Sequence, residues 1–147
     1  MIFVSTTFTP DNTPLIEALR LCKSIGITNV EIGSNHTFQP DYSYVKNFEM
    51  EFLVHNYFPV PEKSLVVNIA SHDSLIRKKS IEHIKKSIDF ALEIGAKLYT
   101  FHPGFLKDPS GPNKSSTNYD FEWNNQTVSQ SDYALAWDHM LYAFEEI

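Results

Sequence analysis

The sequence of 147 residues has little cysteine, no visible leader and no long apolar run. Its single cysteine, Cys22, cannot form an internal disulfide, which excludes a small scaffold held together by several disulfides. No apolar run approaches the roughly 20 residues that a membrane-spanning helix needs. The first ten residues lack a basic segment followed by an apolar core, so we expect a cytoplasmic protein without membrane contact.

Positive charge is also scarce, because 12 Lys and Arg residues stand against 18 Asp and Glu residues, a net charge of −6. Proteins that bind duplex nucleic acid gain much of their affinity by neutralising phosphates, so this balance argues against a nucleic-acid partner. The chain has the length of one ordinary domain, which is enough to bury a core. Phosphate-binding glycine loops, paired-cysteine motifs, zinc-protease motifs and nucleophile elbows are all absent from the sequence.

Short apolar runs alternate with segments of helical periodicity along the chain. The pattern predicts strands at residues 2–5, 28–34, 51–58 and 96–102. It predicts helices at residues 9–27, 71–94 and from about 129 to 132 onward, with Gly26 and Gly95 ending the first two. Strands that alternate with helices indicate an α/β fold with a parallel sheet of about four βα units. A closed eightfold barrel takes roughly 250 residues, so these units make only part of one.

A long polar segment at residues 106–128 follows the fourth predicted strand and is rich in Pro, Ser and Asn. Loops of this length are uncommon in compact domains and usually act as lids or binding segments. We therefore predict a lid-like loop, in which Trp123 and Asn124 are candidates for ligand contact.

Polar side chains follow each predicted strand. In parallel α/β architectures, functional groups gather at the carboxyl ends of the strands. The residues at these positions are Ser5 and Thr6, Glu31 and Ser34, His55 and Asn56, and His102. We expect them to share one polar site beneath the lid-like loop.

The two strand-end histidines carry most of this prediction. A neutral imidazole suits metal ligation or proton transfer, so His55 and His102 are candidate ligands, although each could instead hydrogen-bond to nearby backbone. Glu31 stands in an apolar strand, and because a buried carboxylate needs a partner, we favour a position facing a polar cavity over one at the sheet edge. Tyr57 could line a substrate pocket or belong to the core. By contrast, His36 and His72 are expected to be solvated, and His83 and His139 to be surface or packing residues.

Three stretches resemble one family: NVEIGS at 29–34, FLVHNYFPVPEKSLVVNIAS at 52–71, and the segment from IRKKS to FHPGF at 76–105. They resemble the xylose-isomerase-like TIM-barrel superfamily, above all the sugar phosphate isomerases and epimerases, and more distantly endonuclease IV. The resemblance covers residues 1–147 as the N-terminal half of a (β/α)8 barrel. It thus implies a single, incomplete TIM-barrel domain.

The resemblance implies a divalent metal ion, Zn, Mn, Mg or Co, at the mouth of the barrel. Histidines after the third and fourth strands are metal ligands in the endonuclease IV-like members, and His55 and His102 match them. Glu31, Asn56 and Tyr57 would then bind substrate. The acidic residues that the isomerases use come from later strands, so no catalytic residue is assigned here, and the chain alone need not retain the metal.

Three functions remain open at this point. The first is the N-terminal part of a metal-dependent sugar or sugar-phosphate isomerase or epimerase, which transfers a proton next to a carbonyl. The second is a phosphodiester hydrolase like endonuclease IV. The third is a non-catalytic half-barrel that works by association, as a homo-oligomer or with a C-terminal half. The first of these is our leading hypothesis, and whether this chain is itself an enzyme stays open.

Overall fold

The computed structural model describes residues 1–109 and 127–147, in which strands and helices alternate. In chain order, its elements are β1 (Val4–Ser5), a 3-10 turn (Thr6–Phe8), α1 (Leu15–Ser24), β2 (Asn29–Ile32), a second 3-10 turn (Ser43–Asn47), β3 (Glu51–His55), α2 (Ser74–Glu93), β4 (Tyr99–Thr100) and α3 (Gln130–Glu146). Most of the lid-like loop predicted at 106–128, with Trp123 and Asn124, lies outside the described residues.

The strands form one parallel sheet in the order β1-β2-β3-β4. This confirms the predicted α/β fold of four βα units, and it matches half of a TIM barrel. Each strand is shorter than its apolar run, since β1 and β4 contain two residues each. The predicted strand residues beyond these limits continue as loops at the ends of the sheet.

Local sequence signals set the limits of the helices. The side chain of Asp73 caps α2, because its Oδ1 accepts a hydrogen bond from the backbone N–H of Leu75 at 2.7 Å. A capping box between Ser129 and Asp132 begins α3. Such caps satisfy backbone donors that have no partner inside the helix and typically contribute about 1 kcal/mol. The capping box explains why α3 starts where the sequence predicts.

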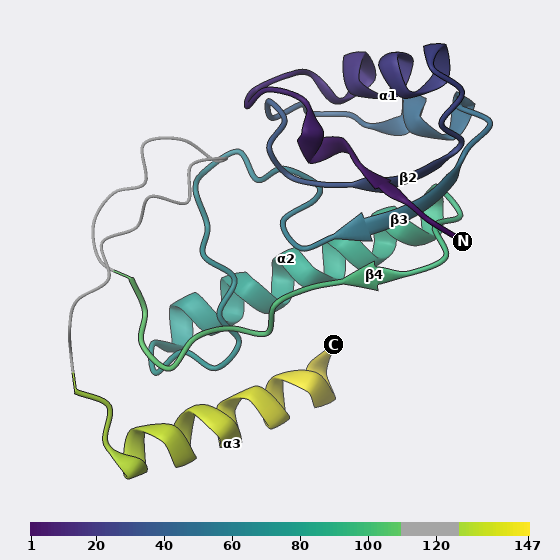
Figure 1. The fold of residues 1–147 in the computed structure, drawn as a ribbon. Coiled ribbons are helices and arrows are strands. Elements are labelled where there is room, and N and C mark those ends of the chain that lie inside the picture. The colour runs from purple at the N-terminus through teal and green to yellow at the C-terminus, as the bar shows by residue number, and fades with distance from the viewer. Residues whose placement is uncertain (110–126) are drawn as a thin grey trace.

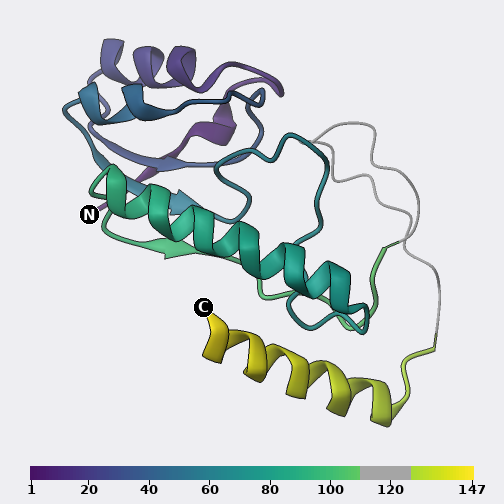
Figure 2. The same ribbon diagram turned by 180° about the vertical axis from the view of Figure 1, so that it is seen from behind.

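One face of the sheet is buried beneath α1 and α2, which lie together on that side in Figures 1 and 2. Alternate strand residues point to this face: Val30, Ile32, Phe52 and Val54 are buried. They belong to one apolar cluster with Leu15, Leu19 and Cys22 of α1 and with Phe90 and Ala91 of α2. Each large apolar side chain contributes roughly 1.5 to 3 kcal/mol when fully buried, so this layer is the main core.

The last helix, α3, lies beside α2 (Figure 1), and Ala143 joins it to a second cluster that includes Ile69 and Ile84. Much of its apolar surface remains uncovered by the described residues, because Trp137 is 51% and Phe144 is 47% exposed. None of the helices in the described residues is both long and apolar enough to cross a bilayer.

The opposite face of the sheet has no helix over it in the described part of the chain (Figure 1). We call it the open face and define it by Ser5, Glu31, Leu53, His55 and Thr100, which are all partly exposed. The register places Ser5, Glu31 and Leu53 in one row and His55 with Thr100 in another. Paired residues of a parallel sheet share a face, so the polar side chains of the four strands lie on one surface.

Candidate functional site

The two strand-end histidines lie next to each other. Their ring centroids are 5.7 Å apart, and the planes of the rings are nearly perpendicular, at 86°. His55 is the last residue of β3, and His102 follows β4 by two residues. His55 is partly exposed and His102 exposed, so both imidazoles can be reached from solvent. The structure thus brings together the two residues on which the predicted metal site depends.

A threonine holds the ring of His55. Nδ1 of His55 lies 2.9 Å from the hydroxyl oxygen of Thr100, its partner in the β3–β4 register. Within the described residues, no hydrogen bond involves Nε2 of His55 or either ring nitrogen of His102. A histidine whose second nitrogen is engaged in this way has a fixed ring orientation, as metal-binding histidines usually have. The sequence analysis did not identify Thr100 as part of the site.

Asn56 connects the two strand ends. It adopts the left-handed conformation, with φ of 47°, and its side chain is buried. Its Oδ1 accepts a hydrogen bond from the backbone N–H of His102 at 3.4 Å, and its own N–H donates to the carbonyl of Thr100 at 2.6 Å. In these contacts Asn56 positions backbone, and its predicted role in binding substrate stays a prediction.

The carbonyl of Asn56 also accepts a hydrogen bond, from a partly buried tyrosine. The hydroxyl of Tyr99 donates to it at 2.9 Å. Burial raises the pKa of Tyr99 to about 12, while a hydrogen bond with Ser87 opposes the shift. The phenol therefore stays protonated and remains a donor at neutral pH.

The loop after His102 is fixed by Asn68. The Asn68 side chain donates to the carbonyl of Phe105 at 3.0 Å and to Asp108 at 2.8 Å, while its Oδ1 accepts from the backbone N–H of Phe105 at 3.0 Å. Gly104 has a φ of +148°, and a Cβ there would lie only 2.0 Å from Asn68 Oδ1. This close approach, which only glycine permits, holds the His-Pro-Gly turn against the segment before α2.

Glu31 and Tyr57, the other two predicted substrate contacts, take different positions. Glu31 lies on the open face, paired in register with Ser5 on one side and Leu53 on the other. Tyr57 is 5% exposed in the second apolar cluster, and its hydroxyl accepts a hydrogen bond from the N–H of Val67 at 3.3 Å. Glu31 therefore shares a surface with His55, whereas Tyr57 packs in the core. Their roles in substrate binding stay predictions.

The prediction that His36 is solvated is wrong, because the residue is fully buried. Its Nδ1 lies 2.8 Å from the carbonyl of Thr13, and its Nε2 lies 2.7 Å from the hydroxyl of Thr6. A carbonyl can only accept, so Nδ1 carries the proton and Nε2 accepts from Thr6. Burial lowers the pKa of His36, against a smaller effect of the Thr13 hydrogen bond, and the ring is neutral.

Two other polar residues expected at the strand ends do not face the open side. Thr6 is fully buried, and its hydroxyl also accepts a hydrogen bond from the N–H of Gly33 at 2.9 Å. Ser34 is buried too. Together with His36, Thr6 links the end of β1 to the segment after β2. The polar surface at the carboxyl ends is therefore smaller than the sequence predicts.

The donor set at this end of the sheet supplies two nitrogens for a metal ion. No group of three or more His, Cys, Asp or Glu residues able to hold a metal occurs among residues 1–109 and 127–147. Tight catalytic zinc sites usually have three protein ligands and a water molecule. The histidine pair thus fits part of a metal site, and the described residues do not complete one.

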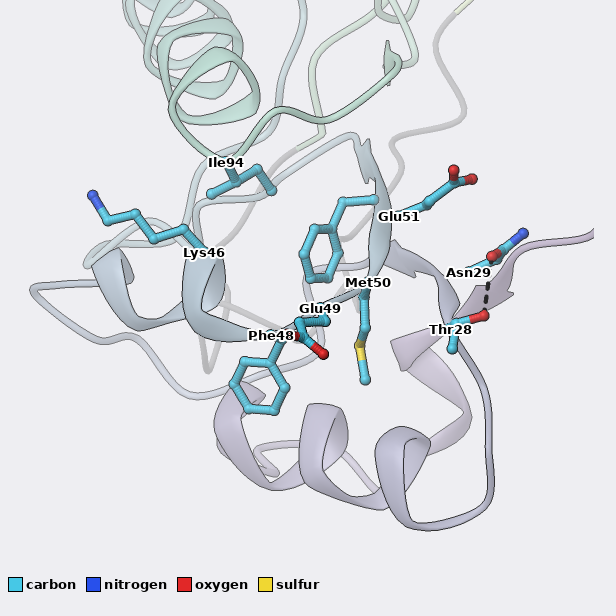
Figure 3. Close-up of a pocket in the computed structure, with 9 residues that line it drawn as sticks. Thr28, Asn29, Lys46, Phe48, Glu49, Met50, Glu51 and Ile94 are labelled. Atoms are coloured by element: carbon cyan, nitrogen blue, oxygen red, sulfur yellow. Dashed lines mark hydrogen bonds between the residues drawn. The ribbon is translucent and has the colours of Figure 1, made fainter.

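A pocket of about 500 Å³ lies at the opposite end of the sheet (Figure 3). It is lined at the amino ends of β2 and β3 by Thr28, Asn29 and Glu51 and by the neighbouring Met50 and Ile94. Glu51 is paired with Lys97 at 2.7 Å. Because ligands of parallel α/β sheets bind at the carboxyl ends, this pocket is no candidate for the same chemistry.

Comparison with known proteins agrees with this architecture. No curated protein and no solved structure matches the chain. The sequence model of a family described as xylose isomerase-like TIM barrel matches residues 19–140, a span that begins within α1 and ends within α3. Because this span takes in most of the chain and the four strands are parallel and in sequential order, the protein belongs to the xylose isomerase-like TIM-barrel family.

Proposed function

We propose that the chain forms the N-terminal part of a metal-dependent sugar or sugar-phosphate isomerase or epimerase. The observation that carries the proposal is the pair of imidazoles, 5.7 Å apart, at the carboxyl ends of β3 and β4. The family match supports the coarser statement that the protein is related to sugar isomerases and epimerases or to endonuclease IV-like enzymes. The metal, the substrate and the proton transfer belong to the proposal.

In this proposal His55 and His102 hold a divalent metal ion. A metal ion held there would supply positive charge to stabilise a substrate oxygen when a proton leaves the carbon next to a carbonyl. Thr100 fixes the ring of His55, and Asn56 fixes the backbone of His102. Glu31, on the same face as His55, contacts substrate hydroxyls. The remaining metal ligands and the catalytic acids come from further strands, in a C-terminal half or in a second copy of the chain.

Metal binding tests this assignment directly. We would titrate the chain with Co²⁺ and follow its visible absorption, comparing His55→Ala and His102→Ala with the control His72→Ala. His72 also lies near a second histidine, His139, with ring centroids 5.9 Å apart, so it is a matched pair elsewhere on the surface. Loss of either site histidine should weaken binding at least about tenfold, and loss of His72 less than about twofold. The reverse order would contradict the assignment.

Activity is tested on the protein together with the further strands that supply the catalytic acids, with aldose and ketose sugars and their phosphates, before and after removal of metal with a chelator. Conversion that stops with the chelator and returns with added metal would support the proposed chemistry. Conversion that is indifferent to metal removal would contradict it.

A nuclease of the endonuclease IV kind is the second candidate, because a pair of strand-end histidines suits it equally well. The net charge of −6 opposes it, since a nuclease must attract phosphates. Binding to a duplex that contains an abasic site, measured at low salt, separates the two candidates. A nuclease should bind the duplex and a sugar enzyme should not.

Association without catalysis is the third candidate, and exposed apolar surface favours it. Within the described residues, β1 and β4 each have a neighbouring strand on one side only, and Trp137 and Phe144 of α3 are about half exposed. Unpaired edges and apolar faces of this kind promote assembly. Light scattering should show a stoichiometric oligomer if this candidate is right, whereas a stable monomer would argue against it.

A further inference from the structure

We propose that Asn68 is a positioning residue, which holds the imidazole of His102 opposite that of His55. Asn68 lies in the segment between β3 and α2 and is fully buried. The inference rests on the proposed function, because it concerns the same pair of rings. It goes further by assigning control of their geometry to a residue in a different segment of the chain.

His102 depends on its backbone for its position. The hydroxyl of Thr100 holds the ring of His55, but the ring of His102 is exposed and makes no hydrogen bond to the described part of the chain. On the side before His102, Asn56 accepts the hydrogen of its backbone N–H at 3.4 Å. That distance exceeds the roughly 2.7 to 3.2 Å usual for such bonds, so this contact alone constrains His102 loosely. The support that follows His102 therefore matters.

The support after His102 comes from the segment around Asn68. The N–H of Ile69 donates to the carbonyl of Pro103 at 2.9 Å. Asn68 itself binds both backbone groups of Phe105, because its Nδ2 donates to the carbonyl and its Oδ1 accepts from the N–H, each at 3.0 Å. These bonds fix the turn that begins at Pro103, directly after the ring-bearing residue.

The amide of Asn68 has no spare hydrogen-bonding capacity. Its Oδ1 also accepts from the N–H of Ala70 at 3.1 Å, and its Nδ2 also donates to Oδ1 of Asp108 at 2.8 Å. Two donors and two acceptor positions are all that an asparagine side chain offers, and all four are used. The other carboxylate oxygen of Asp108 accepts from the hydroxyl of Ser71 at 2.5 Å. The amide therefore has one orientation, and it holds the turn against the segment before α2.

A histidine on a loop binds a ligand well only if a rigid scaffold holds the loop in place. Residues that orient a metal-binding histidine from outside the ligand shell typically change metal affinity about 10- to 100-fold when they are lost. Thr100 has that part for His55. We assign it to Asn68 for His102, through the backbone of the turn.

The variant Asn68→Asp tests the inference with the least change in shape. It removes both donors of the amide and puts a second carboxylate beside Asp108, so the turn loses its attachment. Ser80→Ala is the matched control. The Ser80 hydroxyl is also buried and accepts from the N–H of Asn68 at 2.9 Å, but its other hydrogen bonds go to the carbonyls of Val66 and Ile76. Both variants break a buried hydrogen bond of Asn68, and only the first reaches the turn after His102.

The first measurement uses the full chain without metal. We expect nuclear Overhauser contacts between the ring protons of His55 and His102, whose centroids are 5.7 Å apart, in the wild type and in Ser80→Ala. They should be lost in Asn68→Asp. The second measurement is Co²⁺ titration, in which Asn68→Asp should bind at least about tenfold more weakly than the wild type and Ser80→Ala less than about twofold. Ring contacts that persist in Asn68→Asp, or equal Co²⁺ affinities in the two variants, would overturn the proposal.

Failure of this inference can be told apart from failure of the proposed function. If the wild-type chain binds no Co²⁺, the metal assignment is wrong, and the ring contacts still decide whether Asn68 places His102. If Asn68→Asp does not fold, Asp108→Ala takes its place in both measurements, since it removes one partner of the amide from a partly exposed position. It should weaken the ring contacts and reduce Co²⁺ affinity about threefold or more. No difference between Asp108→Ala and Ser80→Ala would overturn the proposal.

Discussion

The side-chain oxygen of Asn56 lies 3.4 Å from the backbone nitrogen of His102 and accepts its hydrogen. This bond joins the residue after β3 to the residue that carries the second imidazole of the site. It explains why an asparagine follows His55: the position needs both a left-handed backbone, with φ of 47°, and a side-chain acceptor. Asparagine tolerates that conformation better than most residues with a side chain.

Substitution of Asn56 should separate the two requirements. Asn56→Gly keeps the backbone conformation accessible and loses only the side-chain bond, so we expect a loss of about 1 kcal/mol in the free energy of unfolding. Asn56→Ala loses the bond and also strains the backbone, for a total of about 2 kcal/mol or more. Urea unfolding measures both values. Equal losses of unfolding free energy in the two variants would mean that the left-handed backbone does not restrict which residue can stand at position 56.

Gly104 should tolerate no side chain. A Cβ there would lie 2.0 Å from Asn68 Oδ1 and 3.0 Å from Asn68 Cα, so Gly104→Ala must displace the segment that fixes the His102 turn. We expect a loss of at least about 2 kcal/mol in the free energy of unfolding. Gly26→Ala is the matched control, since Gly26 also has positive φ, +77°, but nothing lies within 4 Å of its Cβ. Urea unfolding should show a larger loss at Gly104, and a larger loss at Gly26 would refute this packing.

The arrangement of the strands could be predicted because the signals for it are local. Apolar runs predict the strands, and Gly26 and Gly95 predict the helix ends. Each of these signals is recognised from a few neighbouring residues. The prediction that His55 and His102 meet was also within reach, because the carboxyl ends of parallel strands share one edge. Thr100 could have been found by the same logic, since strand alternation puts it on the face of His102 and in register with His55.

The positions of His36 and Thr6 could not be read from the sequence. The sequence predicts solvent exposure for His36 and a place in the strand-end polar site for Thr6, but each is fully buried. They are buried because they satisfy one another: His36 bonds to Thr6 and Thr13, and Thr6 also bonds to Gly33. Contacts between residues about 30 positions apart form only in the folded chain, so no local sequence pattern predicts them.

The bond between Thr6 and His36 makes a direct prediction. Thr6→Val keeps the shape of the side chain but leaves Nε2 of His36 and the N–H of Gly33 without partners. Since an unsatisfied buried group costs about 1 to 3 kcal/mol, we expect a loss of at least about 2 kcal/mol in urea unfolding. Thr6→Ser keeps the hydroxyl and should lose less than about 1 kcal/mol. If the valine variant is as stable as the serine variant, the bond does not hold this segment.

The buried ring of His83 should make stability depend on pH. Its pKa is about 4 in the folded chain and about 6.5 in the unfolded chain, because burial and Lys86 disfavour the charged ring. The unfolded chain therefore binds a proton that the folded chain refuses as the pH falls below about 6.5. The free energy of unfolding is therefore undiminished by this ring above that pH. As the pH falls to about 4, the free energy of unfolding drops by on the order of 3 kcal/mol.

The measurement compares urea unfolding of the wild-type chain and His83→Phe between about pH 7 and about pH 4. Burial also lowers the pKa of His36, but that ring is present in both chains, so its effect cancels in the difference. The wild-type chain should lose stability more steeply than the variant, even if the variant is less stable throughout. Parallel curves would mean that His83 accepts a proton as easily in the folded chain as in the unfolded one, and would contradict this prediction.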